Sequence, residues 1–268
     1  MTKHIFSRIK HYFNVYQGFV ITCFIESMNF RLHFVLLILM DLLFYISALA
    51  SIHIIYNHVE TIGVWNREQL LFFVAFMLGI NQLTMTFVSE SYWRFPELIR
   101  SGDLDFILLK PIGAVFSVFF RYLRPGSLLN MIFTWGVITY YGLRLNLSVF
   151  AWCALPFLLL LGFLLQNAIE MVISCSMFWM LEGSGVNFVR MEMQQLARWP
   201  DFIYNKIVSR ILMTVLPILL IGSAPVRFLF NINDWIPFMG MGLGILLFWG
   251  ILSFIWQLGL ASYESASS

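Results

Sequence analysis

Long apolar runs separated by short polar segments form the main pattern of this chain. A helix needs about 20 apolar residues to cross the hydrocarbon core of a bilayer, and six runs are close to that length or longer. They span residues 32–56, 70–89, 127–143, 147–178, 207–223 and 235–260. Because a lipid-exposed backbone must satisfy its own hydrogen bonds, each run is predicted to be an α-helix. The sequence therefore predicts an all-α, polytopic membrane protein with six transmembrane helices, built as one membrane domain over residues 1–268.

The residues before the first run follow a different pattern, in which apolar side chains recur at helical spacing opposite polar and basic ones. The apolar face holds Ile5, Ile9, Tyr12, Phe13, Tyr16, Phe19 and Val20. This pattern predicts an amphipathic helix that lies in the membrane surface with its basic face toward the headgroups. The alternative is a helix packed on the rest of the protein. Polar Asn14 and Gln17 interrupt the apolar stretch, so a cleavable signal peptide is not expected.

A second interfacial stretch is predicted before the third run. Residues 112–123 are apolar but short, and the basic Arg121 and Arg124 and the pair Pro125-Gly126 interrupt the pattern there. Arginines and helix-breaking residues are costly inside lipid but suit its boundary. We therefore expect residues 112–123 to lie at the membrane surface, with the third span beginning at Ser127.

The basic residues orient the spans, because cytoplasmic loops carry an excess of Lys and Arg. With the N-terminus inside, thirteen of the sixteen basic residues fall in cytoplasmic segments. They are Lys3, Arg8, Lys10, Arg31, Arg94, Arg100, Lys110, Arg121, Arg124, Arg190, Arg198, Lys206 and Arg210. The outer loops hold Arg67, Arg144 and Arg227. Both termini are therefore predicted to face the cytoplasm.

Composition supports a membrane environment and narrows the partners. The chain is 60% hydrophobic and 11% charged, whereas a soluble domain carries about 25% charged residues. The net charge of +2 comes with no basic run or stripe, so nucleic acid is not expected as a partner. Cys23, Cys153 and Cys175 lie in apolar runs without short Cys or His spacing, so neither a disulfide framework nor a metal site is predicted.

The sequence contains no motif for an energy source or for catalysis. A nucleotide-binding loop places a lysine after a glycine, because glycine amides hold the phosphates while the lysine reaches the terminal ones. No lysine of this chain follows a glycine, and no HExxH, Cys-x-x-Cys or Gly-x-Ser-x-Gly motif occurs. We therefore expect another protein to supply the energy or the chemistry.

Residues 91–111, between the second and third runs, mix charged and apolar side chains. Pro96 can start a short helix, and Ser101-Gly102 can end it. The segment is either a solvated connector or a docking site that transmits the movement of a cytoplasmic partner. In the docking interpretation, polar contacts come from Glu97 and Arg100 and burial from Leu98 and Ile99. Asp103 and Asp105 either contact the partner or cap the next helix, with capping favoured for Asp105.

Several polar side chains fall inside the predicted spans. Asp41 is near the middle of the first span, where a charge costs roughly 2.5–3.5 kcal/mol on insertion scales. The others are Asn81 and Gln82 in the second span and Gln166, Asn167, Glu170 and Ser174 at helical spacing in the fourth. They indicate either a translocation pathway or interhelical hydrogen bonds that hold the bundle together. In the last span, Gly240 and Gly244 predict close helix packing.

Three segments give the chain a resemblance to a known family. They are residues 29–34, residues 100–112 followed by 121–125, and residues 197–204 together with the ending 259–268. In these segments and in the order of its parts, the chain resembles bacterial ABC exporter permeases of the second membrane class. It is similar to the branch of that class that contains only the membrane domain.

The resemblance implies a permease that works with ABC ATPase subunits and with a second permease, identical or homologous. Residues 97–105 would be the coupling helix that the ATPase contacts, and residues 224–231 would be the outer re-entrant element. No cofactor would bind to this chain, since ATP and Mg²⁺ bind to the partner ATPase. The chain would lie among the lipids of the bacterial cytoplasmic (inner) membrane and would export its substrate by ATP-driven alternating access.

Two other functions are compatible with the residues. An intramembrane enzyme acting on lipid would use Asp41 or Glu170 as its acid–base group, although no nucleophile–base pair accompanies them. An ion-coupled secondary transporter would use Gly/Pro-broken helices in matching halves, and the sequence shows no such pair. The permease is the function that the whole pattern favours.

Overall fold

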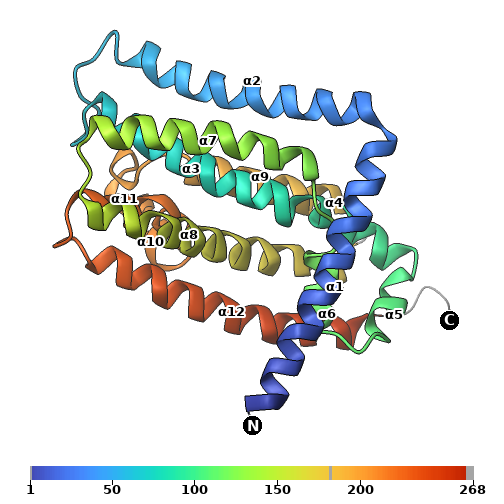
Figure 1. Cartoon of the computed structure of the whole chain (residues 1–268). Coiled ribbons are helices and arrows are strands. Elements are labelled where there is room, and N and C mark those ends of the chain that lie inside the picture. The colour runs from blue at the N-terminus through green and yellow to red at the C-terminus, as the bar shows by residue number, and fades with distance from the viewer. Residues whose placement is uncertain (1, 181–182, 264–268) are drawn as a thin grey trace.

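The fold is a bundle of long helices with shorter helices at both of its ends. The computed structural model describes residues 2–180 and 183–263 (Figure 1). Within these residues the chain is helical or irregular, apart from an isolated β-bridge between Ile62 and Trp65. The all-α prediction is therefore confirmed. Residues 264–268, the last part of the family-like ending, lie outside the described residues.

Four helices have the length and the composition to cross a membrane. They are α2 (Arg31–Ile55), α3 (Arg67–Phe87), α8 (Val149–Cys175, continued by the 3-10 turn η1, Ser176–Phe178) and α12 (Ile236–Ser262). They run side by side with α7 (Pro125–Arg144), which packs against α2 and α3 (Figure 1). These apolar helices make the chain a multi-pass membrane protein.

Short loops turn the chain at one end of the bundle, which we call the loop end. They comprise residues 56–66, 145–148 and 231–235. Asn66 and Gln69 form a capping box at the start of α3, and the Ser148 hydroxyl accepts a hydrogen bond from the Ala151 N–H (3.2 Å) at the start of α8. Asn146 makes the tight turn before α8 at a φ of 51°, which asparagine tolerates.

The opposite end, which we call the short-helix end, holds α4 (Ser89–Arg100), α5 (Asp103–Leu108) and α6 (Ala114–Phe119). Pro96 lies inside α4, so the prediction that it starts a short helix is wrong. The predicted helix end is confirmed, because Gly102 separates α4 from α5 at a φ of 77°, which favours glycine. Asp103 and Asp105 lie in the first turn of α5, where acidic side chains offset the helix dipole.

Helix α1 (Thr2–Asn29) runs across the short-helix end (Figure 1). Tyr12, Tyr16 and Phe19 pack around Phe116 of α6, and the Tyr12 hydroxyl accepts a hydrogen bond from the Gly113 N–H (3.0 Å). Other apolar side chains of α1 stay exposed, namely Ile9, Phe13, Ile21, Phe24 and Ile25. Packing on the protein is therefore confirmed for part of this helix, and its location in the membrane surface stays a prediction.

The predicted fifth span, residues 207–223, is wrong as a continuous helix. The structure contains α10 (Lys206–Thr214) and α11 (Leu220–Phe230), each too short to cross the hydrocarbon core. Pro217 lies between them, and proline removes a backbone donor and disfavours helix at the preceding residue. The Ile221 carbonyl lies beside Gly162 in the middle of α8, whereas Phe230 contacts Trp65 at the loop end. Helix α11, which contains most of the predicted re-entrant element, thus leads from the bundle interior back to the loop end.

Helix α9 (Gly183–Ala197) was not predicted as a membrane-embedded helix, but the structure places it along the bundle. Gly183 lies against Pro96 at the short-helix end. After the helix, Phe202 of the 3-10 turn η2 (Asp201–Ile203) packs edge-on against Trp65 at the loop end, with ring centroids 4.9 Å apart. The chain therefore runs the length of the bundle between Gly183 and Phe202, and Figure 1 shows α9 lying along the long helices.

This path separates four basic residues from the nine with which they were predicted to lie. Arg190, Arg198, Lys206 and Arg210 were predicted to be cytoplasmic, but they follow the point at which the chain leaves the short-helix end. The other nine basic residues of that group precede Pro125, in α1, at the start of α2 and in the segment from α4 to α7. The basic excess therefore remains at the short-helix end.

Accessibility labelling tests the path of α9. In a variant whose native cysteines are replaced by serine, Lys206→Cys is expected to react from the same side of the membrane as Asn57→Cys. It is expected to be protected on the side from which Ser101→Cys reacts, because α9 carries the chain across the bundle. An impermeant maleimide added to sealed, oriented vesicles measures both. Reaction of position 206 together with position 101 would show that α9 does not cross.

Candidate functional site

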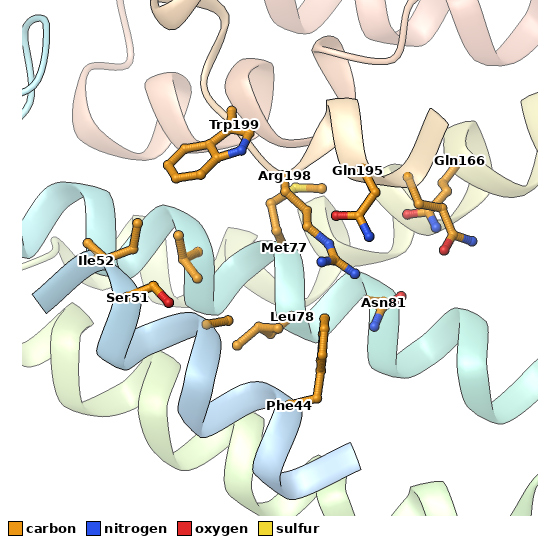
Figure 2. A pocket seen from close by; sticks show the side chains of 13 residues that line it. Phe44, Ser51, Ile52, Met77, Leu78, Asn81, Gln166, Gln195, Arg198 and Trp199 are labelled. Carbon is orange, nitrogen blue, oxygen red and sulfur yellow. The ribbon is translucent and has the colours of Figure 1, made fainter. Parts of the chain in front are cut away.

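A cleft lies between α2, α3 and α9, partway along the long helices. Its first part has a volume of about 200 Å³ and its second part a volume of about 320 Å³. The two parts adjoin each other, because five residues line both, namely Phe44, Asn81, Gln194, Gln195 and Arg198. In Figure 2, Gln195 and Arg198 point from α9 and the turn after it toward Phe44 on α2 and Asn81 on α3.

The polar wall of the cleft belongs to α9 and the turn that follows it. Arg190, Gln194 and Arg198 are spaced by four residues, which places them on one face of a helix. Gln195 lies beside this stripe. The walls on α2 and α3 are mostly apolar and include Phe44, Ala48, Ile52, Val74, Met77 and Leu78. The cleft therefore offers charged and amide groups on one side and an apolar surface on the other.

A buried ion pair attaches α9 to α8. Arg190 donates to the Glu170 carboxylate (3.2 Å), and each of the two side chains is only 2% exposed. Gln166 and Gln194 each donate to Glu170 Oε1 (2.8 Å), and Arg190 also donates to the Asn187 side-chain oxygen (3.2 Å). Because donors occupy both carboxylate oxygens, Glu170 is an anchor for α9 and is poorly suited to act as an acid–base group.

Tyr92 of α4 connects this ion pair to the short-helix end. The Arg190 guanidinium lies over the Tyr92 ring, 4.3 Å from its centroid. The Tyr92 hydroxyl donates to the Asn167 side-chain oxygen (3.0 Å), and the Asn167 amide donates to Thr84 Oγ1 of α3 (3.2 Å). Burial, with the Glu170 carboxylate nearby, raises the pKa of Tyr92 well above its usual value, so the hydroxyl remains a donor at neutral pH.

A second polar network holds α2, α3 and α7 together. The Tyr45 hydroxyl donates to the Gln82 side-chain oxygen, and the Gln82 amide donates to the Ser127 carbonyl. The Ser127 hydroxyl in turn donates to Asp41 (3.2 Å), and the Arg124 guanidinium lies 3.9 Å from the same carboxylate. Asp41 therefore has partners at the start of α7, which offset the cost of its charge at this depth.

The structure divides the polar residues that the sequence predicted into two groups. Gln82 and Asn167 are buried and bonded between helices, so they hold the bundle together, as does Glu170 through its pair with Arg190. The predicted residues that line the cleft are Asp41, Asn81 and Gln166. The interhelical interpretation is therefore confirmed for the first group, and a translocation role for the second group stays a prediction.

The sequence analysis missed the α9 residues that form the polar wall. Arg190 and Arg198 lower the mean hydropathy of this segment, so it does not resemble a transmembrane helix. Its polar composition instead suggested a cytoplasmic loop. The signal that could have identified the helix is the four-residue spacing of Arg190, Gln194 and Arg198 within an amphipathic segment. Such a stripe is tolerated in a membrane bundle when it faces other helices or a wet path.

At the short-helix end, the residues predicted to contact a partner divide between surface and core. Glu97, Arg100 and Asp103 are exposed, and Asp103 accepts a hydrogen bond from the Ser101 hydroxyl (2.8 Å). Leu98 is 7% exposed and belongs to the hydrophobic core. The prediction that Leu98 supplies burial to a partner is therefore wrong, because α4 turns this side chain inward.

Two other apolar residues occupy the surface beside these charges. Phe106 of α5 is 68% exposed and Leu109, just after it, is 83% exposed. Ile99 and Asp105 are half-buried. We call the exposed set the short-helix surface; it comprises Glu97, Arg100, Asp103, Phe106 and Leu109.

Residues with metal-binding side chains are dispersed. In the part of the chain that the structure describes, no group of three or more His, Cys, Asp or Glu side chains is placed to hold a metal ion. Cys23 and Cys175 are buried and Cys153 is exposed, each as a free thiol. The cleft itself is lined mainly by arginine, amide and apolar side chains, together with the carboxylate of Asp41.

Comparison with protein families gives a match over most of the chain. The family described as "ABC-2 family transporter protein" matches residues 42–267. The matched region contains all of α9, the α3 wall of the cleft and the short-helix surface. No curated protein and no solved structure gives a significant match.

Removing the carboxylate of the buried ion pair is expected to destabilise the protein. Glu170→Gln keeps the shape of the side chain but leaves the Arg190 charge buried without a counter-ion. We expect the free energy of unfolding to fall by about 3–5 kcal/mol. Denaturation of the purified protein in detergent, followed by tryptophan fluorescence, measures this change.

The exposed pair between Arg144 and Glu68 (3.5 Å) provides a matched control. Arg144→Gln is expected to change the free energy of unfolding by less than about 1 kcal/mol. The double variant Glu170→Gln, Arg190→Gln is expected to recover part of the lost stability, since no uncompensated charge remains. Equal stability of Glu170→Gln and Arg144→Gln would contradict the anchoring role of the buried pair.

Proposed function

The chain belongs to the ABC-2 family and is a membrane permease subunit of an ABC transporter, and we propose that it exports its substrate through the cleft between α2, α3 and α9. The observation that carries this proposal is the polar stripe of Arg190, Gln194 and Arg198 at the depth of long apolar helices. Polar groups at this depth are costly unless they face other helices or a wet path. Separate ATPase subunits would bind ATP and Mg²⁺ and drive the change of access.

We propose six membrane crossings, made by α2, α3, α7, α8, α9 and α12, within one membrane domain over residues 1–268. Helix α7 has 20 residues, a length of about 30 Å that matches the hydrocarbon core. Helix α9 has 15 residues, and the turn after it completes the crossing. Helices α10 and α11 would form the outer re-entrant hairpin. The basic excess at the short-helix end favours a cytoplasmic location for this end and for both termini, in the bacterial cytoplasmic (inner) membrane.

A second permease, identical or homologous, would close the cleft. Part of the α9 surface is exposed and carries Glu192 and Gln195 beside the apolar Phe188 and Met191. A carboxylate such as Glu192 is costly in lipid, whereas a neighbouring protein helix can give it hydrogen bonds. Two permeases that face one another through this surface would enclose the pathway between them.

The short-helix surface is the proposed docking site for the ATPase. An ATPase without a covalent link to the membrane domain must act through a small, rigid contact. Glu97 and Arg100 offer polar contacts, while Phe106 and Leu109 offer apolar area. Helix α4 also carries Tyr92, which contacts Arg190 of the cleft. A displacement of α4 by the ATPase would therefore reach the cleft through Tyr92 and Arg190.

Charge reversal or a new charge on the short-helix surface is expected to uncouple the ATPase. Arg100→Glu and Phe106→Asp should each reduce co-purification of the ATPase by about tenfold or more, because a contact residue becomes a desolvated, unpaired charge. Both variants are expected to remain in the membrane, since these side chains are exposed. Co-purification and substrate-stimulated ATP hydrolysis are the measurements.

Val64 at the loop end provides a matched control, because it is an exposed apolar residue at the other end of the bundle. Val64→Asp is expected to leave ATPase association unchanged. Leu98→Asp is not an informative probe of docking, because it places a charge in the core. Wild-type co-purification and hydrolysis in both Arg100→Glu and Phe106→Asp would mean that this surface is only a connector.

A further inference from the structure

Arg198 places a positive charge in the middle of the bundle. It is the only charged residue among those that line the first part of the cleft. Its guanidinium lies over the ring of Phe44, 4.6 Å from the centroid, and Phe44 is near the middle of α2. Figure 2 shows the side chain directed into the cleft. The charge is therefore held at mid-depth, within reach of a molecule in the cleft.

Arg198 forms no ion pair and no side-chain hydrogen bond with the residues that the structure describes. The ion pairs of the bundle engage five other arginines, namely Arg94, Arg124, Arg144, Arg190 and Arg227. An arginine does not lose its proton in a protein, and an uncompensated charge at this depth is unfavourable. Its contact with the face of Phe44 offsets only part of that cost. An anion bound in the cleft would supply the missing counter-charge.

The other charged groups of the cleft already have partners. In its second part, Arg190 is paired with Glu170 (3.2 Å). Asp41 accepts a hydrogen bond from Ser127 (3.2 Å) and lies 3.9 Å from Arg124. The unbalanced charge of the whole cleft is therefore positive and is located at Arg198.

The remaining wall selects for a ligand that is partly apolar. Around Arg198 it presents the aromatic rings of Phe44 and Trp199 and the aliphatic side chains of Ile52, Val74, Met77 and Leu78. The amides of Asn81, Gln166 and Gln195 supply a few hydrogen-bond donors and acceptors. A small inorganic anion would leave the apolar wall without contacts, and a neutral hydrocarbon would leave Arg198 without a partner.

We infer that the cleft binds an amphipathic organic anion, in which a carboxylate, phosphate or sulfonate contacts Arg198 and an apolar body contacts Phe44 and Trp199. This inference rests on the proposed function in one respect, namely that the bound molecule is the transported substrate. Binding itself does not require the ATPase. A binding experiment on the full chain therefore tests the ligand class separately from transport.

The experiment uses three matched probes that share one apolar body and differ in charge: pyrenebutyrate, pyrenebutanol and pyrenebutyl-trimethylammonium. The full-length permease is placed in phosphatidylcholine nanodiscs, and energy transfer from tryptophan to pyrene is measured against empty nanodiscs. The anionic probe is expected to bind about tenfold more tightly than the alcohol, from one charge-assisted contact. The cationic probe is expected to bind most weakly.

Three variants assign the preference to Arg198. Arg198→Gln is expected to bring the anionic and neutral probes to equal affinity, while Arg198→Lys retains most of the preference because it keeps the charge. Arg198→Glu is expected to favour the cationic probe. Because the Arg198 side chain makes no hydrogen bond within the described residues, these variants should stay folded, which size-exclusion chromatography checks. Arg144→Gln, an exposed arginine at the loop end, is the control and should bind as the wild type does.

Equal binding of the three probes to the wild type, or an anion preference that survives in Arg198→Gln, would overturn the inference.

A further arm of the experiment identifies the source of the anion. Displacement of pyrenebutyrate when phosphatidylglycerol is added to the nanodiscs would indicate an anionic lipid as the ligand. Retention of the probe in the presence of that lipid would indicate a soluble amphipathic anion. If ATPase association fails while anion binding holds, the transport function is refuted and the ligand class stands.

Discussion

The ion pair between Glu170 and Arg190 allows a polar helix to lie inside an apolar bundle. Helix α9 contains Arg190 and is followed directly by Arg198. Two arginines would keep an isolated helix of this composition out of lipid. The Glu170 carboxylate on α8 neutralises the first of them, and Gln166 and Gln194 complete its hydrogen bonds. The position of α9, and with it the polar wall of the cleft, depends on this buried contact.

The same contact links the cleft to the short-helix end. Arg190 lies on the ring of Tyr92, and Tyr92 belongs to α4, whose last turn carries Glu97 and Arg100. Buried side chains are packed closely and do not deform gradually, so a shift of α4 must be matched by a shift at Arg190. A short chain of contacts therefore connects the surface proposed for the ATPase with the wall of the proposed pathway.

Arg190 of α9 and Arg198 in the turn after it have different environments because, among the described residues, only Arg190 forms an ion pair with a carboxylate. Arg190 is enclosed by Glu170, Asn187 and Tyr92, which fix its position. Arg198 is two turns further along and meets an aromatic ring and amides. The ion pair of Arg190 with Glu170 holds α9 against α8. The charge of Arg198, which has no such partner among the described residues, makes the cleft positively charged.

The sequence by itself determined the all-α membrane class, the helices α2, α3, α8 and α12, the family and the end of α4 at Gly102, because long apolar runs and glycine turns are local signals. Only the tertiary structure decided that α9 follows the bundle, that residues 207–223 break near Pro217, and that Leu98 points inward while Phe106 points outward. Hydropathy assigns each arginine the same cost wherever it lies. The real cost depends on partners distant in the chain, as Glu170 is from Arg190, and the fold alone brings such partners together.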